Sequence, residues 1–145
     1  TYEEIVDWLE SEEKAVCHLF TVDNLSYLHK GGRISKTQAI IGATLGIKPL
    51  LKLTNTEQEL KLYSKVRGRQ KSLNQLVEDI KNRTTDNKNE FIFISHADCK
   101  DDADYCAKLI KKSYNCNTYI ADMTPTIGAH VGPGAVNITF FSKEN

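Results

Sequence analysis

Apolar residues recur at helical spacing in several segments of this chain. Over 1–14, Ile5, Trp8 and Leu9 stand at i, i+3 and i+4 among acidic residues, which predicts an amphipathic helix. Segment 35–45 is apolar nearly all the way round, which predicts a helix that is buried on several sides or lines an apolar cavity. Further helices are expected after Asp23, which offers an N-cap, then along Leu73, Leu76, Val77 and Ile80, and along Ala103, Cys106, Ala107 and Ile110.

Short apolar runs and strict alternation predict the strands. Segments 47–54 and 57–66 are expected to form a hairpin around Asn55 and Thr56. Pro49 cannot donate a ladder hydrogen bond, so the first arm lies at a sheet edge or the proline lies among its first residues. The other expected strands are 15–22, 91–95, 118–121 and 136–141.

The second arm of the hairpin should have two unlike faces, because side chains alternate along a strand. One face should meet the core, and it carries Leu60, Leu62 and Val66. The other should be cationic, and it carries Lys61, Tyr63, Lys65 and Arg67.

Strand, helix and strand follow one another between 91 and 121, which predicts a right-handed crossover and a parallel pair. Because the hairpin upstream is antiparallel, the sheet should be mixed. The predicted fold class is α+β, a two-layer sandwich with the helices mainly on one face of the sheet. With 145 residues, 40% of them hydrophobic, 1–145 suits a single domain with a sizeable core.

Charge and cysteine content argue against several classes of protein. Nineteen Lys and Arg residues balance nineteen Asp and Glu residues, so no net basic charge favours nucleic acid. The four cysteines form no CxxC pair, which favours reduced thiols and a cytoplasmic location over disulfides. His96, Asp98 and Cys99 come nearest to a metal-binding group but lack a second ligand pair, so no metal or other cofactor is expected.

Segment 126–135, TIGAHVGPGA, is the strongest candidate site. Gly128, Gly132 and Gly134 bracket His130 just before a strand. Glycine lets backbone N–H groups approach an anion, and an imidazole adds a hydrogen-bond donor. The alternative is a Gly-Pro turn with an exposed histidine. The segment is expected to be a loop in which no helix begins, unlike a phosphate loop.

Two other segments concentrate positive charge. Arg33, in KGGRI, could grip a carboxylate or phosphate with its planar fork, or could cap the carbonyl groups of the preceding helix. Segment 65–71, KVRGRQK, is either a binding surface or simply a solvated face. No nucleophile elbow is present, and only the adjacent Cys17 and His18 suggest a thiol–imidazole pair, so an autonomous enzyme is disfavoured.

Four segments, taken in this order, closely resemble the C-terminal half of the bacterial DegV family: FTVDNLSYLHKGGRIS, LGIKPLLKL, KVRGRQKSL and TIGAHVGPGA. The resemblance covers nearly the whole chain. It implies a two-domain fatty-acid-binding protein whose N-terminal α/β domain, which holds a Ser/Thr carboxylate site, is absent from this chain. Segment 1–14 would then be the helix that follows the missing part.

The resemblance also implies a ligand and a partner. A long-chain fatty acid would lie between the two domains and be presented to a separate fatty acid kinase, which forms the acyl phosphate. Exchange of the fatty acid at a membrane surface fits the same role, and this chain would itself catalyse nothing. The residues expected near the carboxylate are His130, Gly128, Gly132 and Arg33. The residue expected to contact the kinase is Arg67 or, in its place, Arg69. Arg33 and Arg67 could each contact either the head group or the kinase.

Two other functions stay open on the residues alone. A small-molecule enzyme would use His130 as acid and base and would turn over its substrate without a partner. An interaction module would use the basic face at 61–71, and its binding to an oligonucleotide would weaken steeply with salt.

Overall fold

The computed structural model describes residues 1–35, 46–54, 60–84, 91–114 and 116–142. The helix expected over 35–45 and the hairpin turn at Asn55 and Thr56 lie outside the described residues. One sheet of six strands, in the order β3-β2-β1-β6-β4-β5, organises the rest. The strands are β1 (Val16–Thr21), β2 (Ile47–Thr54), β3 (Leu60–Arg67), β4 (Phe91–Ala97), β5 (Asn117–Asp122) and β6 (Ala135–Phe141).

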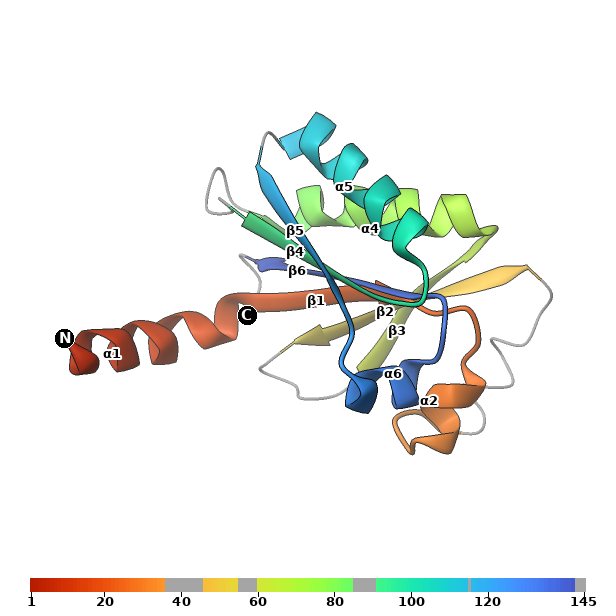
Figure 1. The fold of residues 1–145 in the computed structure, drawn as a ribbon, viewed down its shortest axis with the longest axis horizontal. Helices are drawn as coiled ribbons and strands as arrows, with labels where there is room; N and C mark the ends of the chain where they lie inside the picture. Colours follow the sequence, from red (N-terminus) through yellow and green to blue (C-terminus); the bar gives the residue numbers. More distant parts are fainter. Residues whose placement is uncertain (36–45, 55–59, 85–90, 115, 143–145) are drawn as a thin grey trace.

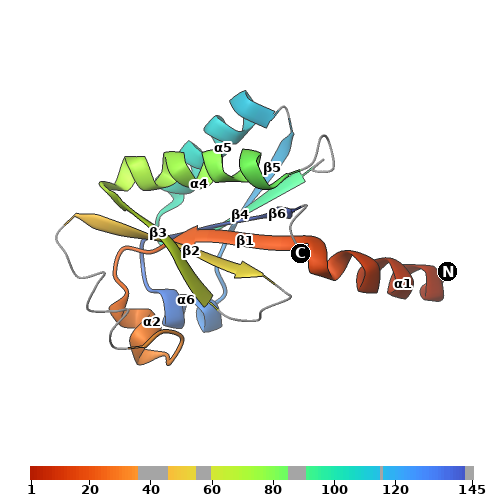
Figure 2. The same ribbon diagram turned by 180° about the vertical axis from the view of Figure 1, so that it is seen from behind.

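The helices lie on both faces of this sheet, the two long ones together (Figure 1). α4 and α5 cover one face, whereas the short α2 and α6 lie on the other, as the view from behind also shows (Figure 2). β4 and β5, which α5 connects along the chain, pair in parallel. All other neighbouring strands are antiparallel. The predicted α+β class with a mixed sheet is confirmed, and in addition two short helices lie on the face opposite the two long ones. The helices are α1 (Tyr2–Glu12), α2 (Ser26–Lys30), α4 (Arg69–Arg83), α5 (Lys100–Tyr114) and α6 (Pro125–Val131), with a short 3-10 helix η1 (Glu13–Ala15) after α1.

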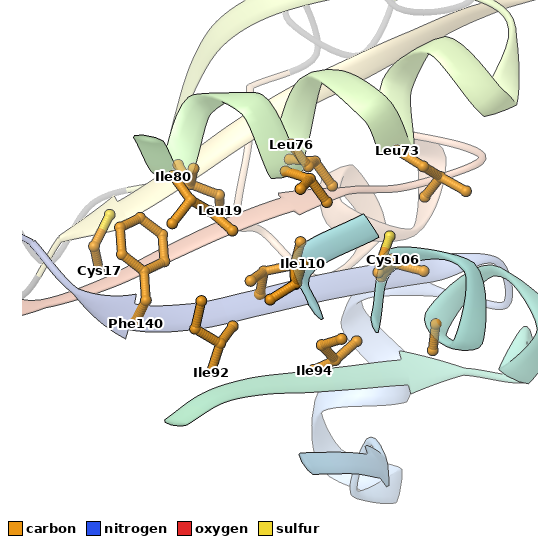
Figure 3. Close-up of a cluster of buried hydrophobic side chains, with 14 of the residues drawn as sticks. Cys17, Leu19, Leu73, Leu76, Ile80, Ile92, Ile94, Cys106, Ile110 and Phe140 are labelled. Atoms are coloured by element: carbon orange, nitrogen blue, oxygen red, sulfur yellow. The ribbon is translucent and has the colours of Figure 1, made fainter. Parts of the chain in front are cut away.

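The larger core lies between the sheet and the two long helices (Figure 3). α4 contributes the apolar stripe that its spacing predicts, and α5 contributes Ala103, Cys106 and Ile110. The strands contribute Leu19, Ile94 and Ile138, each of which is at most 1% exposed. A second, smaller core lies on the other face of the sheet under α2 and α6, and it includes Phe20, Leu28, Ile34, Leu51 and Val131.

The assignment of faces along β3 is wrong, because the alternation of side chains is broken by a bulge. Leu50 of β2 lies opposite Ser64, but Leu51 lies opposite Leu62, so Tyr63 is an extra residue in β3. Tyr63 therefore packs with Val66 against the larger core, under α4, while Leu62 packs against the smaller one. There is no continuous cationic face with Tyr63 in it.

β2 is an interior strand, which decides between the two expectations for Pro49. β1 pairs with β2 from Leu50 to Thr54, so Pro49 lies beyond that ladder and faces only Lys65 of β3. The proline is thus tolerated among the first residues of its strand, and the expectation of a sheet edge is wrong.

Two local predictions are also wrong. Segment 126–135 was expected to hold no helix, yet α6 begins at Pro125, a residue pre-set for a first helical turn, and ends at Gly132 with φ +76°. Asp23 does not cap α2. The N-cap position is Leu25, which has no capping side chain, and the Asn24 Oδ1 accepts a 2.8 Å hydrogen bond from the Ser26 N–H in the turn before it. Asp23 pairs instead with Lys48.

α1 forms as predicted and begins with a capping box between Thr1 and Glu4. It projects away from the sheet, and none of its residues is buried (Figure 1). The apolar side chains of Ile5 and Trp8 are therefore exposed to solvent, at 60% and 54%. No helix among the described residues has the length and apolar character needed to cross a membrane.

Candidate functional site

A cavity of about 960 Å³ lies on the face of the sheet that carries α2 and α6. Its apolar wall includes Phe20 and Leu53 from the sheet, Leu28 and Ile34 from α2 and the turn after it, and Val131 from α6. A cavity of this size suits a ligand as large as a lipid chain or a cofactor.

Glycines let α2 and α6 approach each other beside this cavity (Figure 1). A Cβ atom added to Gly31 would stand 2.2 Å from Nδ1 of His130, so only glycine leaves room for that ring. In the same way, Gly132 faces the ring of Tyr27. The two glycine-rich segments that the sequence singled out are thus in direct contact.

His130 lines the cavity from the last turn of α6, and its side chain is half-buried. His130 thus faces this cavity and belongs to neither of the two cores. The backbone of this segment differs from the anion-binding loop that was envisaged. The Gly128 N–H donates to Thr124 and the Gly132 N–H donates to Gly128, so both groups are used within the helix.

Arg33 also lines the cavity and is exposed. Its Nη1 donates a 3.0 Å hydrogen bond to the carbonyl oxygen of Gly31, the residue that caps α2. The capping role that the sequence left open is therefore present. The rest of the guanidinium has no hydrogen-bond partner among the described residues, and Arg33 lines the same cavity as His130.

Arg67 and Arg69 have different surroundings although only Gly68 separates them. Arg67 ends β3 with an exposed side chain. Arg69 is half-buried and bridges α4 to α5, because its Nε and Nη2 lie 2.8 and 2.7 Å from Oδ2 of Asp102. A second carboxylate, on Asp23, lies 3.8 Å from Nη1. Of the two, Arg67 is the one available to a partner.

Sequence analysis missed a polar row on the floor of the cavity. Asn137 Nδ2 lies 3.0 Å from Oγ1 of Thr139 and 3.3 Å from Oγ of Ser95. Thr139 Oγ1 in turn lies 3.0 Å from Nδ1 of His18. Burial lowers the pKa of His18, which favours the neutral ring. The alternation of β6 signals that Asn137 and Thr139 point away from the larger core, but that His18 joins them depends on strand pairing.

No disulfide joins any of the four cysteines, which agrees with the reduced thiols expected from their spacing. His96, Asp98 and Cys99 line a second hollow of about 830 Å³ beside the start of α5. Within the described ranges, no three His, Cys, Asp or Glu side chains converge to hold a metal ion.

The chain is similar in sequence to bacterial proteins of one family. A DegV domain-containing protein of Clostridium perfringens is 40% identical over 139 residues, which cover 95% of this chain and 47% of that protein. The chain spans about half the length of the curated relatives it matches.

Solved structures match the fold over nearly the whole chain. The fatty acid binding DegV family protein of Streptococcus agalactiae has a TM-score of 0.82 at 33% identity and covers 99% of this chain and 50% of its own. A Thermotoga maritima protein described as revealing fatty acid binding function has a TM-score of 0.77 at 29% identity, with coverages of 98% and 49%. The Fatty Acid Kinase B3 protein of Streptococcus pneumoniae, loaded with linoleic acid, shares the fold with a TM-score of 0.87 at 19% identity, with coverages of 99% and 50%.

The family model for "Uncharacterised protein, DegV family" matches residues 1–143. This match takes in every described strand and helix, including both glycine-rich segments at the cavity. The chain therefore belongs to the DegV family.

Proposed function

We propose that this chain is the C-terminal half of a bacterial two-domain carrier that binds a long-chain fatty acid. The observation that carries the proposal is the cavity of about 960 Å³ with its largely apolar wall, on the sheet face where the short helices α2 and α6 lie. Each buried methylene contributes about 0.8 kcal/mol, so a fatty acid binds where an extensive apolar surface such as this wall can cover its chain. The fatty-acid-binding relatives at 33% and 29% identity support the same ligand.

The fatty acid carboxylate would lie at the α2–α6 end of the cavity. His130 and the free part of the Arg33 guanidinium both face it there, and each can donate hydrogen bonds to a carboxylate. Gly31 and Gly132 would serve by letting the two helices meet, and the N-terminal domain would complete the carboxylate site. The chain then binds and orients its ligand without catalysing a reaction.

A fatty acid kinase would be the partner that acts on the bound carboxylate, in the cytoplasm. Arg67 supports this part of the proposal, because it is exposed and outside the cavity. A charge at the rim of a complex mainly affects association with the partner. The kinase would supply the phosphoryl transfer and its metal ions.

Native mass spectrometry of the complete two-domain protein, purified from bacteria, tests the ligand. We expect a mass increase equal to one long-chain fatty acid, which organic extraction removes and added fatty acid restores. A protein that carries no lipid and binds none in calorimetric titration after extraction would contradict the proposal.

Arg67→Ala tests the partner. In the complete protein this variant should keep its affinity for fatty acid and lose about tenfold in acyl phosphate formation at limiting kinase, with recovery at saturating kinase. Lys71→Ala, another exposed cation nearby, is the matched control and should change neither quantity. A loss that persists at saturating kinase would place Arg67 in the chemical step and overturn the docking role.

A further inference from the structure

We propose that the polar row on the cavity floor recognises a hydroxyl group carried on the hydrocarbon chain of the ligand, so that the protein prefers hydroxylated fatty acids. This inference rests on the proposed function, since it specifies which fatty acid the same cavity takes. The polar row consists of His18, Thr139, Asn137 and Ser95.

The polar row lies in the middle of an otherwise apolar sheet face. His18 of β1 is directly opposite Thr139 of β6, and directly opposite residues share a face of the sheet. On one side, the next positions across the sheet are Leu53 and Leu60. On the other side they are the exposed Phe93 and Tyr119, whose stacked rings lie 5.4 Å apart between centroids. A hydrocarbon chain that crosses this face would have apolar neighbours at both ends and polar ones between.

Hydrogen bonds within the polar row leave a specific donor and acceptor open. The Asn137 amide nitrogen donates to Thr139 and Ser95, and none of the described residues donates to its Oδ1. The Thr139 hydroxyl accepts from Asn137 and can donate to Nδ1 of a neutral His18. In that tautomer Nε2 of His18 carries the proton, and it too has no partner among the described residues.

A hydroxyl group can use either open position. It can accept from Nε2–H of His18 or donate to Oδ1 of Asn137, whereas a plain methylene can do neither. A saturated chain pressed onto the polar row would remove water from both groups and leave them unpaired. Sites built to hydrogen-bond a ligand hydroxyl reject the analogue that lacks it more strongly than apolar pockets reject an extra group.

Competitive titration of the complete, lipid-free protein tests this inference. The ligands are octadecanoic acid and a series of monohydroxy octadecanoic acids with the hydroxyl at positions 3, 8, 10 and 12. We expect one of the hydroxylated acids to bind at least tenfold more tightly than octadecanoic acid. Equal or weaker binding of every hydroxylated acid, while octadecanoic acid binds well, would overturn the inference and leave the proposed function intact. Failure of all the acids to bind would instead contradict the proposed function.

Variants connect the preference to the polar row. Thr139→Val keeps the shape of the side chain and removes the hydroxyl, and Asn137→Leu removes the amide. Each should abolish the preference, with affinity for octadecanoic acid unchanged or higher. Thr126→Val changes an exposed threonine on α6 that does not line the cavity, so it should keep the preference. A hydroxyl preference that survives in folded Thr139→Val protein would show that other residues create it.

Discussion

Position 31 shows how a single glycine can position a candidate ligand group. Because a Cβ at Gly31 would stand 2.2 Å from His130 Nδ1, Gly31→Ala should push the imidazole away from its place at the cavity. We expect the complete protein to lose about tenfold in affinity for fatty acid, because misplaced binding groups are costly, while its fold is retained. The His130 ring resonances in NMR spectra should shift at the same time.

Gly128→Ala is the matched control for that change. Gly128 lies within α6, and a Cβ there would have nothing within 4 Å among the atoms that the structure describes. Alanine should therefore raise the free energy of unfolding by about 0.5–1 kcal/mol through its better helix propensity, without altering affinity. Loss of fatty acid affinity in this variant would mean that the ligand approaches the Gly128 backbone closely.

His18 should make the stability of the domain depend on pH. Its pKa is lower in the folded state than the ordinary value of 6.5, because burial disfavours the charged ring. As the pH falls through 6.5, the imidazole of the unfolded chain therefore takes up a proton before that of the folded chain does. The free energy of unfolding consequently decreases in this pH range. The free energy of unfolding, measured by urea denaturation, should decrease between pH 7.5 and 5. The decrease should be smaller in the His18→Gln variant. An identical pH dependence in the variant would contradict the assignment.

Among the elements, α4 and β3 are joined by Tyr63. Its hydroxyl donates a 2.7 Å hydrogen bond to Asp79 of α4, and the Arg83 guanidinium lies 5.4 Å from its ring centroid. Tyr63→Phe should lower the free energy of unfolding by about 1–2 kcal/mol, as expected for a hydrogen bond to a charged group. Tyr2→Phe, at the exposed start of α1, should change it by less than about 0.5 kcal/mol in the same denaturation series. Equal effects of the two substitutions would contradict this role.

Elements with a strong local pattern could be predicted from sequence, and those decided by their neighbours could not. The helix stripe at Leu73 and Ile80 and the alternation of β6 follow from side-chain spacing alone. The bulge at Tyr63 depends on how β3 pairs with β2, which no single strand encodes. At the candidate site the glycine-rich segments were recognised, but the polar row was not, because His18 and Thr139 meet only through strand register.

On the scale of the whole molecule, the domain has its own cores, whereas its ligand site is proposed to need a second domain. Both cores lie within the described residues, so the isolated chain should unfold cooperatively. Its fatty acid affinity should nevertheless be at least a hundredfold below that of the complete protein, because the N-terminal domain is proposed to supply part of the carboxylate site and to cover the cavity. Calorimetric titration of the two proteins with the same fatty acid makes the comparison. Submicromolar affinity of the isolated chain would contradict it.

The place of β6 in the sheet has a consequence for biosynthesis. β6 is the last strand to leave the ribosome among those described, yet it lies between β1 and β4 and is the strand that joins them. Until β6 emerges, the strands β1 to β3 and the strands β4 and β5 can pair only as two separate sheets. Val16 of β1 pairs with Phe141 of β6, which is synthesised 125 positions later. Until β6 is made, the nascent chain therefore exposes the edges of β1 and β4 that β6 later covers, and chaperones protect such surfaces from aggregation.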